Sequence, residues 1–177
     1  ERTGATVFGE FKSFVETLMI IKLQFFSFLI CFLMCGQIMA DDKNYFGGTA
    51  KIDDQRSLIF VGKEIPNNYR DYPDLISIYW DYEPVNEGGM PDDATVKVQR
   101  EFENLVKFLD IESVSHQVLT MTGNGEKEWH WYVKDRNTWL QEFNQALQGH
   151  IQYPIELEVE YQPDWDFYQG FIEKMEQ

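Results

Sequence analysis

With 177 residues, the chain is long enough for one domain and too short for two large ones, and its 44% hydrophobic and 25% charged residues argue against disorder throughout. The formal net charge is −15, and this excess lies entirely in the 137 residues after position 40, which hold 27 acids and 12 bases. Because nucleic-acid binding depends on Lys and Arg side chains that neutralise phosphates, the charge excludes DNA and RNA as partners and favours solubility or a basic partner.

Residues 19–40 are predicted to be a secretory signal peptide. A short basic start is followed by an apolar run of about a dozen residues and by small residues before a polar region, and we expect cleavage after Ala40. This places the mature protein in the periplasm or outside the cell, with no stable membrane span after cleavage. A membrane anchor through residues 19–40 is the alternative, although the 17 residues from Leu23 to Met39 are fewer than the roughly 20 that a spanning helix needs. Residues 1–18 are expected to be an upstream extension or a fragment edge.

Both cysteines, Cys31 and Cys35, lie inside this apolar stretch. Lipidation at Cys35 would be a further way of attaching the protein to a membrane, but Leu33 and Met34 precede it where small residues are expected. If the stretch is removed, the mature domain has no thiol and can form no disulfide, thiolate metal site or cysteine nucleophile.

After a polar lead-in at 41–56, the chain is predicted to form a single α+β domain over residues 57–177. Helices are expected after the N-cap residues Asp92 and Asn137, each with an apolar stripe on one side. Apolar runs and alternation with a period of two predict strands at 57–62, 75–82, 116–122, 128–134 and 155–161.

From residue 75 onward the order is strand, helix, strand, strand, helix, strand. The two central strands are joined by Gly123-Asn124-Gly125, which predicts a type I′ hairpin turn. This order is that of the ferredoxin-like βαββαβ fold, in which an antiparallel sheet carries both helices on one face. The run at 57–62 would add an N-terminal edge strand. A short C-terminal helix after Asp164 would cover part of the other face.

Several loose motifs occur in an order and spacing that resemble one known family. They are Ile-Tyr-Trp-Asp-Tyr at 78–82, Gly-Met-Pro at 89–91, the hairpin residues 120–125 and 128–132, and Pro-Ile-Glu at 154–156 with the segment 164–168. In these motifs the chain is similar, over about residues 57–175, to the bacterial domain-of-unknown-function family 695. That family has no established activity, so the resemblance implies a fold and supplies no functional residues.

The three histidines do not predict a metal site, because zinc needs three or four ligands at one point. With a two-residue turn in the hairpin, His130 lies opposite Leu119 and His116 opposite Val133. The two histidines then point to opposite faces of the sheet, and His150 lies in a loop after the second helix. No metal and no cofactor is therefore predicted.

Three acidic pairs could bind calcium or act as glycosidase carboxylates: Asp53-Asp54, Asp92-Asp93 and Asp164-x-Asp166. The sequence lacks the spacing of a calcium loop, and Asp92 and Asp164 stand where helices need caps, so capping is the simpler interpretation. The sequence also has no Gly-x-Ser-x-Gly elbow, phosphate-binding loop or dinucleotide fingerprint. No catalytic residue is predicted.

Aromatic residues supply one binding hypothesis. The run at 129–132 lies on one hairpin arm, so its aromatic side chains project from both faces of the sheet. One face packs on the helices, and the other is either covered by the aromatic residues at 167–171 or open to a ligand. In the second case Tyr79, His130 and Tyr132 would line a shallow site.

The last strand supplies the other hypothesis. Its alternating Glu156, Glu158 and Glu160 form either a solvated face or an anionic strip that receives a cationic peptide or amine. The favoured function is a non-catalytic binding or protein-interaction module of the cell envelope. A hydrolase with carboxylates that converge only in three dimensions is the first alternative, and an acidic inhibitor of a basic enzyme is the second. Two carboxylates about 5–10 Å apart in a deep pocket would favour the hydrolase, and a filled sheet face would favour the binding module.

Overall fold

The computed structural model describes residues 45–51 and 57–175. Its strands are β1 (Tyr45–Lys51), β2 (Ser57–Lys63), β3 (Asp74–Asp81), β4 (Ser115–Gly123), β5 (Glu126–Val133) and β6 (Glu156–Tyr161). Its helices are α2 (Asp93–Val106), α3 (Arg136–Leu147) and α4 (Asp166–Met175), with the short 3-10 helices η1 (Tyr69–Asp71) and η2 (Lys107–Leu109). The predicted mixed α+β class is confirmed.

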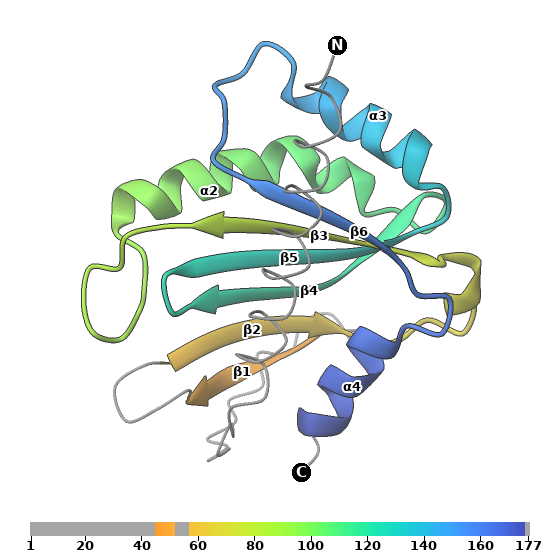
Figure 1. Cartoon of the computed structure of the whole chain (residues 1–177), viewed down its shortest axis with the longest axis horizontal. Coiled ribbons are helices and arrows are strands. Elements are labelled where there is room, and N and C mark those ends of the chain that lie inside the picture. Colours follow the sequence, from red (N-terminus) through yellow and green to blue (C-terminus); the bar gives the residue numbers. More distant parts are fainter. Residues whose placement is uncertain (1–44, 52–56, 176–177) are drawn as a thin grey trace, which may run out of the picture. The chain divides into compact units, whose positions relative to one another are not determined.

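Within the described residues, the strands form one antiparallel sheet of six strands in the order β1-β2-β4-β5-β3-β6 (Figure 1). This order differs from the predicted sheet, which had five strands and placed 57–62 at an edge. β2 instead lies between β1 and β4, because part of the polar lead-in pairs with it along its whole length. The sequence pattern missed β1 because Gly47 and Gly48 disfavour a strand.

The helices α2 and α3 cover one face of the sheet and enclose an apolar core. On β3, the buried Ile76, Ile78 and Trp80 point to this face with the predicted period of two. Phe102 of α2 is fully buried among them, and its ring centroid lies 5.2 Å from that of Trp129 on β5. The amphipathic stripe of α2 thus seats the helix on the central strands.

The C-terminal helix α4 covers the opposite face, where a second apolar core lies. Trp165, just before α4, stacks on Tyr132 of β5 with ring centroids 4.0 Å apart and an interplanar angle of 11°. The Tyr168 hydroxyl accepts a hydrogen bond from the backbone N–H of Lys63 at 2.8 Å and donates one to the Lys63 carbonyl. The C-terminal segment therefore covers this face over β2, β4 and Tyr132 of β5, which was the first of the two alternatives for it.

The Gly-Met-Pro loop before α2 packs against the tip of the β4–β5 hairpin. Asn124 and Gly125 have φ angles of 56° and 81°, as the predicted type I′ turn requires. The N–H of Gly125 donates to the carbonyl of Gly89 at 2.9 Å, and a Cβ at Gly89 would lie 2.5 Å from the backbone nitrogen of Asn124. With a φ of 79° as well, Gly89 admits no side chain. Two of the sequence motifs thus form one structural unit.

Aspartates cap the N-termini of α2 and α3. Asp92 Oδ1 accepts from the backbone N–H of Thr95 at 2.7 Å, as predicted, and this hydrogen bonding lowers the pKa of Asp92. The prediction that Asn137 caps α3 is wrong. Asp135 Oδ1 accepts from the N–H of Thr138 at 2.6 Å, so the helix begins two residues earlier. Both residue types are strong N-caps, and the negative charge of Asp also interacts favourably with the helix dipole.

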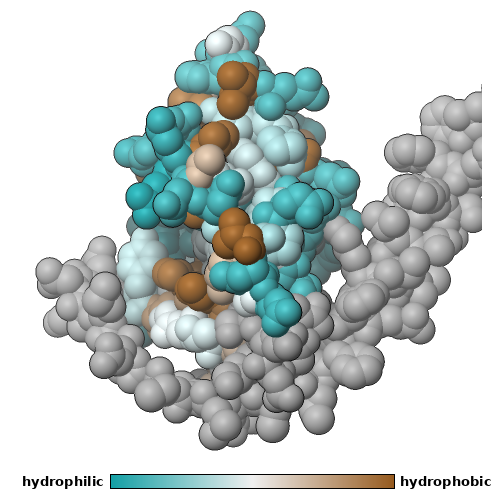
Figure 2. Space-filling model, turned by 90° about the vertical axis from the view of Figure 1, so that its left-hand side faces the viewer, coloured by the Kyte–Doolittle hydropathy of each residue, from teal (hydrophilic) through white to brown (hydrophobic). Residues whose placement is uncertain are grey.

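The side of the molecule that carries the start of α2 and the β4–β5 turn is mainly hydrophilic where described residues are visible, and its hydrophobic side chains form separate patches (Figure 2). No helix among the described residues is long and apolar enough to cross a membrane. The predicted signal peptide at 19–40 lies outside the described residues.

Candidate functional site

Two predicted ligand-binding residues, Tyr79 and His130, lie on the sheet face that carries α4, and His130 belongs to a row of polar contacts. The register places His130 opposite Ser77, and Glu128 lies on the same face two residues away along β5. Ser77 Oγ lies 2.9 Å from His130 Nδ1, and His130 Nε2 lies 3.2 Å from Glu128 Oε2. The Tyr79 ring contacts the imidazole edge to face, with centroids 6.2 Å apart.

Two members of this row, Ser77 and His130, are closed to solvent. His130 is 1% exposed and Ser77 is 4% exposed, and the ring of Phe167 lies 4.6 Å from the imidazole. Serine, histidine and carboxylate in this order are used in nucleophilic catalysis, but a buried serine meets no substrate. The row satisfies its own buried polar groups and fixes the pairing of β3 with β5.

Tyr132, the third residue of the predicted shallow site, is fully buried under Trp165. Its hydroxyl donates to Gln162 Oε1 at 3.0 Å, and burial raises the pKa of Tyr132 well above its ordinary value. A ligand would reach Tyr132 and His130 only after α4 had been displaced. The structure thus brings the three predicted residues to one face and covers two of them, His130 and Tyr132, whereas Tyr79 stays partly exposed.

The three predicted glutamates, Glu156, Glu158 and Glu160, are all exposed on β6. They share the face of Tyr79, whose hydroxyl donates to Glu158 Oε2 at 3.1 Å. Burial, with the charge of Glu158 as the second cause, raises the pKa of Tyr79 far above its ordinary value. The apolar residues of β6 pack against the core under α2 and α3, so the strand is held firmly while its glutamates stay in solvent.

The position of His116 in the sheet differs from the predicted one. A register shift between Gln117 and Leu119 in β4 places His116 opposite Tyr132 and leaves His130 opposite Leu119. Because such a bulge adds one residue to one strand, it reverses the face of every residue beyond it. His116 and His130 therefore lie on the same face of the sheet, contrary to the prediction from a regular hairpin.

We expect His116 to make the protein less stable in mild acid. Burial, the largest cause, lowers the pKa of His116 below its ordinary 6.5. The unfolded chain then binds a proton more readily than the folded chain, so this residue makes the free energy of unfolding fall as the pH drops below about 6.5. In urea unfolding, the free energy of unfolding of the His116→Gln chain should fall less between about pH 7.5 and about pH 5 than that of the parent chain.

The matched control for this prediction is His150→Gln, which replaces an exposed histidine after α3. Its pH dependence should follow that of the parent chain. An equal loss of stability in the parent and the His116→Gln chains would contradict the assignment.

Among the described residues, no group of three or more His, Cys, Asp or Glu side chains is placed to hold a metal ion.

The carboxylate of Asp164, expected as a helix cap, accepts hydrogen bonds from the Arg70 guanidinium, with Oδ1 at 3.3 Å from Nε and 3.2 Å from Nη2. The pair Asp53-Asp54 lies outside the described residues.

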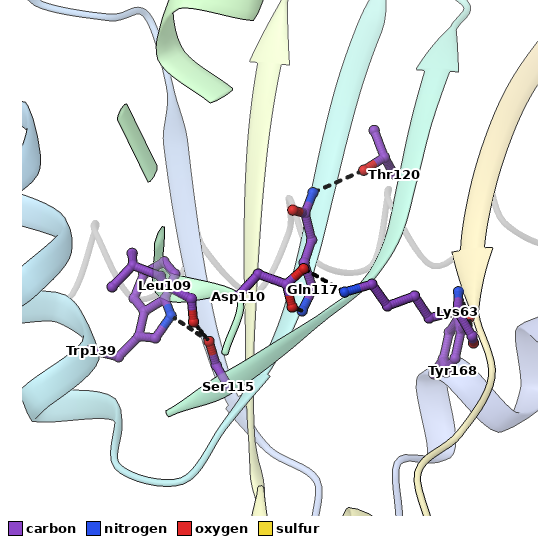
Figure 3. A network of polar contacts seen from close by, with 8 residues as sticks. All are labelled: Lys63, Leu109, Asp110, Ser115, Gln117, Thr120, Trp139 and Tyr168. Carbon is purple, nitrogen blue, oxygen red and sulfur yellow. Dashed lines mark hydrogen bonds and ion pairs between the residues drawn. The ribbon is translucent and has the colours of Figure 1, made fainter. Parts of the chain in front are cut away.

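A second polar cluster joins the end of β2 to η2 and β4 (Figure 3). Lys63 Nζ forms an ion pair with Asp110 Oδ2, and their side chains are 19% and 20% exposed. Asp110 Oδ1 accepts from the backbone N–H of Gln117 at 3.0 Å, and Gln117 Nε2 donates to Thr120 Oγ1 at 3.0 Å. Burial alone lowers the pKa of Lys63, but the hydrogen bond and charge of Asp110 outweigh it and raise that pKa. Lys63 is therefore a cation at neutral pH and no nucleophile.

Ser115 fixes the position of this cluster. Its hydroxyl donates to the carbonyl of Leu109 at 2.5 Å and accepts from Trp139 Nε1 at 3.1 Å, all inside the fold (Figure 3). Because Asp110 follows Leu109 directly, these bonds hold its carboxylate over β4.

Sequence reasoning missed four of these polar residues. Alternation puts Ser77 on the face of Tyr79, and Glu128 on the face of His130, but no turn joins β3 to β5 and sets their register. Lys63 and Asp110 are 47 residues apart and belong to no motif, so no local signal could have paired them.

A protein-family model described as a family of unknown function, DUF695, matches residues 43–172. The comparison with curated proteins and the comparison with solved structures gave no match.

Proposed function

The chain belongs to DUF695, a family of unknown function, and we propose that it is a non-catalytic binding module that engages a basic partner along β6. The observation that carries this proposal is the position of β6. It pairs with β3 on one side and stands at the end of the sheet, with three exposed glutamates along one face.

An end strand presents backbone N–H and C=O groups to which an extended peptide can add as a further strand. The glutamates disfavour pairing between two copies of this chain, which carries a net charge of −15. The same charges attract an extended segment that carries Lys or Arg at alternate positions. The same glutamates would thus protect the edge against self-association and select a basic strand.

The coverage by the C-terminal segment also supports binding at the edge, because it leaves His130 and Tyr132 without access to a ligand. The carboxylate hydrolase and the acidic inhibitor remain alternatives with less support than this proposal. A groove of about 440 Å³ and a pocket of about 100 Å³ are each lined by a single carboxylate, Glu142 and Asp110, whereas a glycosidase needs two.

Two finer assignments belong to the proposal. The four strands in the order β6-β3-β5-β4, with α2 and α3 as crossovers, would form a ferredoxin-like unit that β1 and β2 extend. The pattern at 19–40 supports export to the periplasm or the cell exterior, with a membrane anchor as the alternative.

We expect a blocked peptide of alternating Lys and Val to bind the full chain and to lose affinity about tenfold when Glu156, Glu158 and Glu160 are all replaced by Gln. The loss follows from three screened ion pairs, so it should shrink at high salt. Fluorescence anisotropy of the labelled peptide, measured at low and high ionic strength, gives the affinity.

A second triple variant, Glu87→Gln, Glu101→Gln and Glu173→Gln, changes the net charge equally at three other exposed positions. Its affinity for the peptide should stay within about twofold of the parent value. Equal losses in the two triple variants, or no binding to the parent chain, would contradict the proposal.

A further inference from the structure

The pocket of about 100 Å³ lies between β1, β2, β4 and the end of η2, at the opposite end of the sheet from β6. Its polar part is the cluster of Lys63, Asp110, Gln117 and Thr120 (Figure 3). Its apolar part includes Tyr45, which is 44% exposed. Three strands and a helix end thus bring a charged pair, an amide, a hydroxyl and an aromatic ring to one opening.

The charges of the pocket favour an uncharged ligand. The ammonium of Lys63 and the carboxylate of Asp110 compensate each other, so neither an anion nor a cation finds an unopposed partner. The net charge of −15 adds a further barrier to anions. What the pocket offers is a set of hydrogen-bond donors and acceptors of both kinds, from Gln117, Thr120 and the ion pair.

The rim favours a ligand with an apolar side. Tyr45 and Val61, which are 44% and 48% exposed, line the pocket, and Ile59 continues the same face of β2 with 47% exposure. The Lys63 ammonium lies 5.1 Å from the centroid of the Tyr45 ring, so the ring stands directly beside the polar groups. An aromatic surface next to mixed hydrogen-bonding groups suits a sugar ring, which has C–H groups on its faces and hydroxyls at its edge.

We propose that this pocket binds a neutral saccharide unit. Hydroxyl groups of the sugar hydrogen-bond to Asp110, Gln117 and Thr120, and its apolar face rests on Tyr45 and Val61. The pocket holds part of one sugar ring, so the rest of the saccharide lies along the exposed face of β1 and β2. This site is separate from the β6 edge and does not depend on the function proposed there.

The test is a titration of the full chain with glucose, with N-acetylglucosamine, and with a neutral trisaccharide built from each of these sugars. Ligand-observed NMR measures the binding. We expect at least one of these to bind with a dissociation constant on the order of 1 mM. Glucuronate and glucosamine serve as the matched anionic and cationic sugars, and both should bind more weakly. Thr120→Val should weaken binding about fivefold, because it removes a hydroxyl that hydrogen-bonds in the pocket.

Thr122→Val is the control, because Thr122 is the next residue on the same face of β4 and lies outside the pocket lining. It should leave the affinity unchanged. Tyr45→Ala tests the rim independently and should also weaken binding about fivefold. The proposal is overturned if no neutral sugar binds at roughly 50 mM, if a charged sugar binds more tightly, or if Thr120→Val and Thr122→Val behave alike.

Discussion

Replacement of Trp165 by Ala should lower the free energy of unfolding by about 3–5 kcal/mol, one of the two largest effects that we expect in this fold. The Trp165 ring is fully buried, stacks on Tyr132, and donates its Nε1–H to the carbonyl of Tyr72 at 2.9 Å. Its loss leaves a cavity and an unpaired carbonyl and removes the main contact of the segment that leads into α4. Urea unfolding, followed by circular dichroism, measures the change.

Two further variants separate the causes. Trp165→Phe keeps a ring on Tyr132 and loses the hydrogen bond, so it should cost about 1–2 kcal/mol. Glu173→Ala changes an exposed residue of α4 and should stay within about 0.5 kcal/mol of the parent. A loss below about 1 kcal/mol in Trp165→Ala would mean that α4 does not cover the sheet in solution.

The core under α2 should be equally sensitive. Phe102→Ala is expected to lower the free energy of unfolding by about 3–5 kcal/mol, because a fully buried aromatic ring is removed from close packing. The Phe102 ring lies 5.3 Å from that of Tyr153 and 6.1 Å from that of Phe143, in addition to its contact with Trp129. A single substitution therefore disturbs the contacts of α2 with α3 and with the sheet.

Phe108→Ala is the matched control, because the same residue type stands on η2 with 49% exposure. Its loss should be below about 1 kcal/mol. Similar losses for Phe102→Ala and Phe108→Ala would contradict the assignment of the core. Both variants can be compared by urea unfolding under the same conditions.

Local patterns predicted most of the secondary structure. The alternation around Ile76 and Ile78, the stripe that contains Phe102, and the turn at Asn124 each follow from short-range geometry, and each is found. β1 was missed because its two glycines disfavour a strand, and the strand forms through its pairing with β2. The correct cap Asp135 was missed because two strong capping residues stand two positions apart.

The candidate sites were less predictable, since they depend on contacts between distant segments. The exposed glutamates of β6 followed from alternation alone, and the structure places them in solvent. The bulge beside Gln117 reversed the face of His116, and no feature of the sequence indicated it. Lys63 and Asp110 meet only because α2 and η2 carry the carboxylate back over β4.

Coverage of the central strands on both faces is what directs the proposed partner to the edge of the sheet. α2 and α3 occupy one face above the central strands, and α4 fills the other above Tyr132 and His130. β6 keeps one side unpaired among the described strands and carries Glu156, Glu158 and Glu160 in solvent. A basic extended segment therefore finds backbone groups and complementary charge at one place.

Amide hydrogen exchange of the full chain, with and without the alternating Lys and Val peptide, tests this binding mode most directly. We predict slower exchange at backbone amides of β6 and unchanged exchange in β1, the strand at the other end of the sheet. Slower exchange in β1 or α4 with no change in β6 would contradict the account.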